Sequence, residues 1–310
     1  MNYLTPINQT KLFGLDIFFF ELVRLFEKNN LPNKILLSGQ KGLGKSTLAY
    51  HFINYVLSKD EEFKYDIQNL EINTENRSFK TIINKSNPNM ILIDSDPEKK
   101  MIDINQIRDL ISKLNKSSFN TKPRFVLIDN IDLLNTNSIN ALLKVVEEPS
   151  FNVHFILINN NKKVLPTLSS RCINFRIYLN HNEILTVSNK LLDEKLNEKI
   201  NKDLINYYLT PVNIYNLAKF GENNKYNLID LDLKNLLKII ISQSHYKKDL
   251  LIKEFVFDLI EFYLRKINFT FSTRIHKKYS YFLKRISDTK RFNLDQESLF
   301  IEFEEDILNG

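Results

Sequence analysis

The chain has 310 residues, of which 43% are hydrophobic and 26% are charged, and its formal net charge is +6. This length predicts two or three domains with an ordinary buried core, in a globular protein. A single cysteine excludes a disulfide framework and any cysteine-based zinc site, and no apolar run reaches the roughly 20 residues that cross a bilayer. We therefore expect a cytoplasmic protein with no membrane partner.

The first functional signal is the segment from Gly39 to Ser46, GQKGLGKS, which fits the phosphate-binding pattern GxxxxGK[ST]. The apolar run 35–38 predicts a strand before this loop, and apolar residues at helical spacing predict a helix over 47–57 after it. Glycines allow the backbone N–H groups of such a loop to face phosphate oxygens, and the helix N-terminus adds its positive dipole. The pattern predicts a nucleotide site.

Each residue type in the loop has a predicted role. Lys45 would reach the β- and γ-phosphates, and the Ser46 hydroxyl would ligate Mg²⁺. The loop backbone and the start of the helix would hold the rest of the nucleotide, through Gly39, Gly42, Gly44 and Thr47. A nucleotide site of this kind does not by itself establish hydrolysis.

Strand and helix signals continue to alternate along the first part of the chain, which predicts an α/β domain with a mainly parallel sheet. Residues 59–88 are polar and irregular and predict no element. Further strands are predicted at 90–93, 125–128, 153–158 and 173–175, and helices at 104–114 and 137–147, the latter stopped by Pro149. Beyond Tyr178 the pattern is helical only, with breaks near Thr210 and over 221–224.

The strand 125–128 ends in Asp129, which is placed to contact the water shell of Mg²⁺. Many phosphate-binding-loop enzymes place a glutamate next, to polarise the attacking water, but here the next residue is Asn130. An amide cannot accept a proton near neutral pH. Asp132 is expected to cap the helix that follows rather than to act in catalysis. Hydrolysis therefore lacks its usual base.

The C-terminal part carries an uneven charge. Twelve Lys or Arg lie between Lys247 and Arg291 against five acids, before an acidic stretch at the end. A basic helical region of this kind fits a nucleic-acid contact, and it fits a solvated helix face or a partner surface equally well.

Three segments resemble one protein family. NALLKVVEEP at 140–149 and LPTLSSRC at 165–172, with its Ser-Arg-Cys motif, are similar to clamp-loader ATPases of the AAA+ class. IDINQIR at 102–108 and NPN at 87–89 are similar to segments of bacterial delta-prime subunits. Over about residues 8–178 the chain resembles the delta-prime family of DNA polymerase III clamp-loader subunits.

This resemblance implies three domains: an AAA+ nucleotide-binding domain over 1–178, a helical lid over 179–225 and an all-α collar over 226–310. It implies ATP or ADP with Mg²⁺ as ligands, with Asn159 as the polar residue that contacts the γ-phosphate. Arg171 matches the arginine that acts in trans, in the ATP site of the neighbouring subunit. Cys172 is expected to be a packing residue. The zinc module of many relatives is absent, and so is the arginine often found in the lid.

The implied function is that of a clamp-loader subunit with weak or no ATPase activity and no polymerase site of its own. Its implied partners are the gamma/tau and delta subunits and, through the complex, the sliding clamp and primed DNA. Two alternatives stay open at this point. One is an active ATPase of the gamma/tau type, and the other is a small-molecule phosphotransferase built on the same loop.

Overall fold

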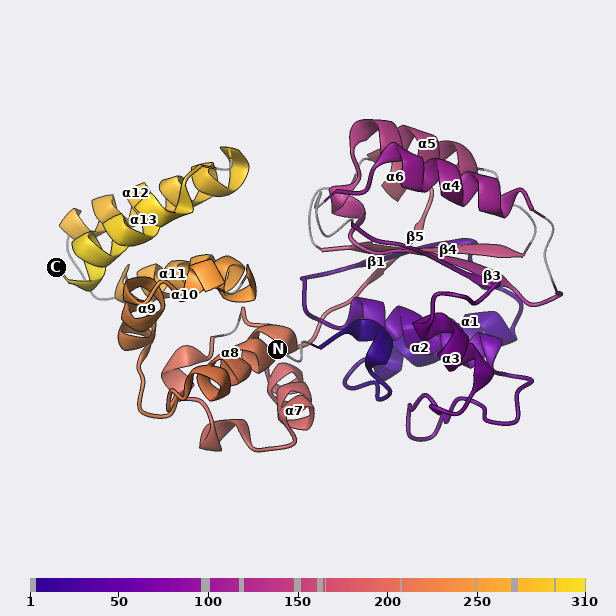
Figure 1. Cartoon of the computed structure of the whole chain (residues 1–310), viewed down its shortest axis with the longest axis horizontal. Helices are drawn as coiled ribbons and strands as arrows, with labels where there is room; N and C mark the ends of the chain where they lie inside the picture. The colour runs from indigo at the N-terminus through magenta and orange to yellow at the C-terminus, as the bar shows by residue number, and fades with distance from the viewer. Residues whose placement is uncertain are drawn as a thin grey trace. The chain divides into compact units, whose positions relative to one another are not determined.

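The computed structural model describes residues 4–95, 101–116, 120–147, 152–160, 164, 166–206, 208–248, 250–268, 273–292 and 294–309. The predicted helix stop at Pro149 and the motif residues Glu148 and Leu165 lie outside this part of the chain. The chain forms two compact units, Met1–Val187 and Ser188–Gly310 (Figure 1), and each is described by itself.

The first unit is built on a parallel five-stranded sheet with the order β2-β3-β4-β1-β5. The strands are β1 (Lys34–Ser38), β2 (Met90–Ile93), β3 (Arg124–Ile128), β4 (Val153–Asn159) and β5 (Ile173–Arg176). All of the predicted strands are therefore confirmed. Strands β1 to β4 are rich in apolar residues because helices cover both faces of the sheet, and every residue of β4 is buried, whereas β5 has the sequence INFR and buries only Phe175.

Helices cover both faces of this sheet (Figure 1). One face carries α1 (Asp16–Glu27), α2 (Lys45–Leu57) and α3 (Arg77–Ile83), and the other carries α4 (Ile104–Leu114), α5 (Thr136–Glu147) and α6 (Pro166–Ser169). Successive strand residues point to opposite faces. Ile35 and Leu37 therefore join the core with Phe52 on α2, whereas Leu36 joins the core with Ile107 on α4.

The segment 59–88, for which no element was predicted, contains α3 and is held by buried polar contacts. Asn76 caps α3 by accepting from Phe79 N, and it exchanges two amide hydrogen bonds of 3.1 and 3.2 Å with Asn54 on α2. His51 Nδ1 lies 2.8 Å from the Tyr65 hydroxyl. Within the described ranges, no group of three or more His, Cys, Asp or Glu is placed to hold a metal ion. Side-chain hydrogen bonds support this insert.

The second unit is helical. The boundary between the units falls within α7 (His181–Leu192), and the helices that follow are α8 (Pro211–Asn224), α9 (Leu233–Ser242), α10 (His245–Lys248), α11 (Leu250–Asn268), α12 (Thr273–Phe292) and α13 (Gln296–Phe303). Thr210 and Pro211 start α8 as its N-cap and first residue. The polar stretch 221–224 is the last turn of that helix. The division into lid and collar near residue 225 stays a prediction.

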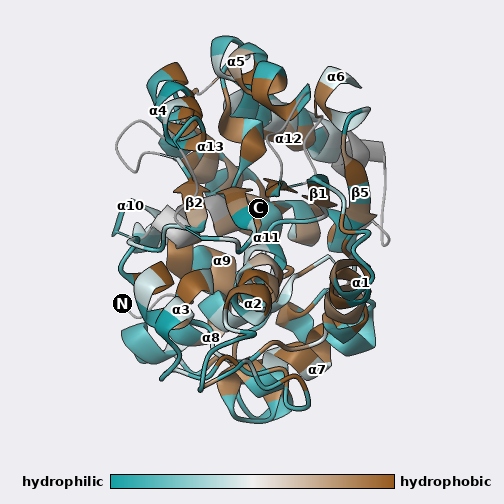
Figure 2. Ribbon diagram, turned by 90° about the vertical axis from the view of Figure 1, so that its right-hand side faces the viewer, coloured by the Kyte–Doolittle hydropathy of each residue, from teal (hydrophilic) through white to brown (hydrophobic). Residues whose placement is uncertain are grey.

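Apolar residues form the strand β2 in the first unit and part of the core in the second. The residues of β2 are coloured as hydrophobic in Figure 2, as expected for MILI. In the second unit Leu237, Val256 and Phe282 are fully buried. No helix in the described part of the chain is both long and apolar enough to cross a membrane.

Candidate nucleotide site

The phosphate-binding loop joins β1 to α2, as the sequence predicted. Gly39, Gly42 and Gly44 have φ angles of +152°, +90° and +85°, a region that side chains with a Cβ rarely adopt. A Cβ on Gly39 would also lie only 2.3 Å from the backbone oxygen of Ile177. The glycines are therefore required by the shape of the loop itself.

Lys45, the first residue of α2, is the buried cation of the site. The residue is only 3% exposed, and its Nζ donates to Gly39 O at 2.8 Å and to Gln40 O at 2.7 Å. Burial lowers the pKa of Lys45 to about 8, and the nearby carboxylates of Asp129 and Asp132 oppose this change. The amino group is thus held inside the loop by carbonyl groups that an anionic ligand could replace.

Ser46 and Asp129 are brought together in the way the metal prediction requires. Ser46 Oγ donates to Asp129 Oδ2 at 2.6 Å. Burial raises the pKa of Asp129, the Ser46 hydrogen bond opposes the rise, and the charge of Asp94 adds to it. A hydroxyl and a carboxylate beside a buried ammonium form a donor set that Mg²⁺ and phosphate oxygens can use. The residues present therefore fit a magnesium nucleotide.

Asn130 lies at the centre of a polar network that the sequence analysis did not identify. Its backbone is left-handed, with φ of +57°, and its Nδ2 donates to Asp94 Oδ1 at 3.0 Å. Its Oδ1 accepts from Asn160 Nδ2 at 2.6 Å. Asp94 and Asn160 follow β2 and β4 directly. A polar residue after each parallel strand, where ligands commonly bind, is therefore the sequence pattern that could have predicted this network.

The structure agrees with the predicted position of Asn159 and disagrees with the predicted capping role of Asp132. Asn159, the last residue of β4, is 5% exposed, and its backbone oxygen accepts from Gly39 N at 3.3 Å. It therefore lies beside the loop as expected, and its contact with a γ-phosphate stays a prediction. The capping role assigned to Asp132 was wrong, because Asn135 Oδ1 accepts from Ser138 N at 2.8 Å at the start of α5. Asp132 lies in a short 3-10 turn before that helix.

A family model described as DNA polymerase III, delta subunit, matches residues 16–181. The chain belongs to this family. The delta′ subunit of Buchnera aphidicola subsp. Schizaphis graminum is 28% identical over 165 residues, which cover 51% of this chain and 47% of that protein. The delta′ subunit of Pseudomonas aeruginosa is 28% identical over 139 residues, or 44% of this chain and 40% of that protein. The matched region thus spans less than half the length of these delta′ relatives.

Other members of the polymerase III system are also similar to the chain. The gamma/tau subunit of Mycoplasma genitalium is 27% identical over 203 residues, covering 64% of this chain and 31% of that protein. The crystal structure of a gamma subunit-related protein from Thermotoga maritima aligns with a TM-score of 0.50 and 19% identity, over 94% of this chain and 97% of that one. This likeness concerns the fold, and the predicted AAA+ architecture is confirmed.

In this member of the delta-subunit family, Arg171 lies at the surface between α6 and β5. Its Nη2 lies 2.9 Å from Glu147 Oε1, and its Nη1 donates to Thr167 O at 2.8 Å, while the side chain stays 37% exposed. Cys172 next to it is partly buried, and burial raises the pKa of its thiol to about 11. A protonated thiol is a poor nucleophile, which agrees with a packing role.

The basic region after Lys247 is partly neutralised within the second unit, because five of its twelve basic residues form ion pairs in the described part of the chain. Its ion pairs join Lys247 to Glu297, Lys266 to Asp203, Lys278 to Asp306, Arg285 to Glu302, and Lys290 to Asp258 and Glu261. Arg265 stacks on the ring of Tyr208 at 4.9 Å. The side chains of Lys253, Arg274 and Lys277 lie outside the described part. Glu302 and Asp306 of the acidic C-terminal stretch thus pair with basic residues of α12.

Proposed function

We propose that this chain is a delta-prime-type clamp-loader subunit that binds ATP or ADP with Mg²⁺ and turns it over slowly or not at all. Its contribution to the reaction is Arg171, donated to the ATP site of a neighbouring gamma/tau-type subunit. In a ring with gamma/tau and delta subunits in the cytoplasm, it supports ATP-dependent loading of the sliding clamp onto primed DNA. The observation that carries this proposal is the amide of Asn130 in the position of the catalytic glutamate.

At the chain's own site, binding and turnover are separated. Lys45, Ser46 and Asp129 would hold the phosphates and the metal, and Mg²⁺ supplies positive charge to the phosphate oxygens when bound. Asn130 cannot take a proton from water. It is also fixed on both sides by its hydrogen bonds to Asp94 and Asn160, so its amide cannot easily turn away to admit another base. These contacts favour an occupied site with little hydrolysis.

The surroundings of Arg171 favour a role in trans. Its ion pair with Glu147 is solvent-exposed on both partners, and exposed pairs contribute only about 0–1 kcal/mol. The guanidinium can therefore leave Glu147 for a phosphate on another subunit at little energetic cost. Its planar group can neutralise charge that develops on a γ-phosphate during transfer.

The test uses the complex reconstituted with gamma/tau and delta subunits. Arg171→Ala should lower DNA-stimulated ATPase activity by roughly 10³-fold at the site it serves, the lower range for arginine fingers, while the complex still assembles. Arg176→Ala, an exposed arginine on β5, is the matched control and should leave activity unchanged. Equal activity of the wild type and Arg171→Ala would refute the finger assignment.

A second candidate is an active ATPase of the gamma/tau type, which the position of Asp94 favours. Its carboxylate lies 3.0 Å from the Asn130 amide and is close enough to raise the pKa of Asp129. In this alternative Asp94 replaces the missing base at the site. Steady ATP turnover by the isolated chain that is lost in both Asp94→Asn and Lys45→Met would establish this alternative.

A further inference from the structure

Within the described part of the chain, strand β2 pairs with another strand along one edge alone. It lies at the end of the sheet order, and its inner edge pairs with β3 through bonds such as Phe125 N to Asn89 O at 2.7 Å and Asp129 N to Ile93 O at 2.9 Å. Backbone groups alternate sides along a strand. The N–H and C=O of Leu92 therefore point away from β3, and within the described residues no backbone group pairs with them.

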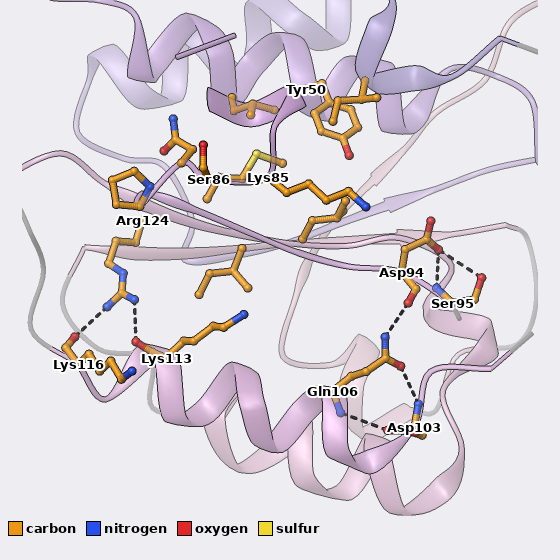
Figure 3. Close-up of a pocket in the computed structure, with 17 residues that line it drawn as sticks. Tyr50, Lys85, Ser86, Asp94, Ser95, Asp103, Gln106, Lys113, Lys116 and Arg124 are labelled. Atoms are coloured by element: carbon orange, nitrogen blue, oxygen red, sulfur yellow. Dashed lines mark hydrogen bonds between the residues drawn. The ribbon is translucent and has the colours of Figure 1, made fainter. Parts of the chain in front are cut away.

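A groove of about 780 Å³ runs along this free edge (Figure 3). Met90 and Leu92 of the strand and Ile82 of α3 give it an apolar floor. Lys85, which follows α3, and Lys113, on α4, border it from the helical layers that cover opposite faces of the sheet. Among the described residues, the edge is thus bordered by a groove and lies between two positive charges.

Basic residues line one end of the groove. Lys85, Lys113 and Lys116 line it together with Arg124, the first residue of β3, which pairs with the start of β2. The guanidinium of Arg124 is used internally, because it donates to carbonyl oxygens at the end of α4, those of Lys113, Leu114 and Lys116. No ion pair involves the three lysine side chains within the described part of the chain.

The other end of the groove is acidic. Asp94 follows β2 and accepts from Asn130, and Asp103 caps α4. A fitting ligand therefore carries negative charge near Met90 and little or none near Asp94. It also needs backbone groups that match the free N–H and C=O of Leu92.

We propose that the β2 edge binds an extended segment of a partner protein as an added strand, with adjacent acidic residues beside the start of β2. Successive residues of a strand point to opposite faces. Two neighbouring acids would therefore reach Lys85 on one face and Lys113 on the other. Main-chain hydrogen bonds to Leu92 supply affinity, and the two lysines supply specificity, as in other strand-addition complexes. Nucleic acid fits less well, since it has no use for the free backbone groups and is repelled at Asp94.

The experiment selects ligands for the full-length chain from displayed random peptides of about eight residues, a common strand length. Selected peptides should be rich in apolar residues, lack proline and contain neighbouring acids. Synthetic copies should protect the Leu92 amide from hydrogen exchange. Lys85→Glu with Lys113→Glu should weaken binding roughly tenfold or more, whereas Lys64→Glu, at an exposed position elsewhere in the first unit, should not.

Leu92→Pro provides a second variant, because proline at this edge position removes the free N–H and leaves the ladder bonds between β2 and β3 in place. It should abolish peptide binding while the circular dichroism spectrum stays native. Failure to select any peptide, or binding that leaves the Leu92 amide unprotected, would overturn the proposal. So would binding of a single-stranded DNA probe that is lost in the double lysine variant without protection of Leu92, which would assign the groove to nucleic acid.

Discussion

Lys45→Met should change the stability of the ligand-free protein in a way that depends strongly on pH. Burial lowers the pKa of Lys45 from 10.5 to about 8. In the unfolded chain the pKa returns to its ordinary value, so unfolded molecules bind more protons between these two values. The buried ammonium therefore destabilises the fold fully below pH 8, and this penalty disappears as the pH rises toward 10.5.

The magnitude follows from the pKa difference. Each pKa unit corresponds to about 1.4 kcal/mol, so the penalty is about 3 kcal/mol near neutral pH and about 1 kcal/mol at roughly pH 10. Methionine is similar in length and carries no charge. Near neutral pH, the free energy of unfolding of Lys45→Met should therefore exceed that of the wild type by about 2 kcal/mol more than it does at roughly pH 10. The variant also loses the hydrogen bonds to Gly39 O and Gln40 O, but this cost is nearly the same at both pH values and cancels when the two are subtracted.

The assay is urea unfolding of both proteins in parallel, followed by circular dichroism. Other titrating groups cancel because only the difference between the two chains is used. Lys45→Met should also lose nucleotide binding, measured by fluorescence of a labelled ATP analogue. A stability difference that is the same at both pH values would show that Lys45 is not held as a buried ammonium, and would refute this account of the loop.

Three further predictions concern single residues of the same unit. Gly39→Ala should cost more than about 2 kcal/mol of stability in thermal unfolding, because φ is +152° and the new Cβ would meet Ile177 O. His51 has its pKa lowered to about 4 by burial, so about 3 kcal/mol of stability should be lost as the pH falls from 6.5 to 4, and His51→Gln should lack this loss. Cys172, with a pKa of about 11, should react with iodoacetamide far more slowly than a free thiol near pH 8, and rapid alkylation would contradict its burial.

Much of the first unit could be predicted from the sequence because its signals are local. Strands β1 to β4 each contain a short apolar run, and the loop 39–46 is a contiguous motif whose glycines are required by backbone geometry. Helix α3 was missed because its support is not local. Its N-cap Asn76 is fixed by Asn54 on α2, and Ser78 at its start binds Glu61. Contacts between polar residues so far apart in the chain leave no periodic pattern.

The same limit applies to the site. Asn130 was recognised as a missing base, but its role is set by Asp94 and Asn160, which lie 36 and 30 residues away along the chain. Parallel topology brings the ends of β2, β3 and β4 to one edge, so polar residues that follow separate strands become neighbours. An acid supplied by β2 therefore stands beside an amide supplied by β3. Whether this chain hydrolyses ATP depends on that pair, and Asp94→Asn tests the pair directly.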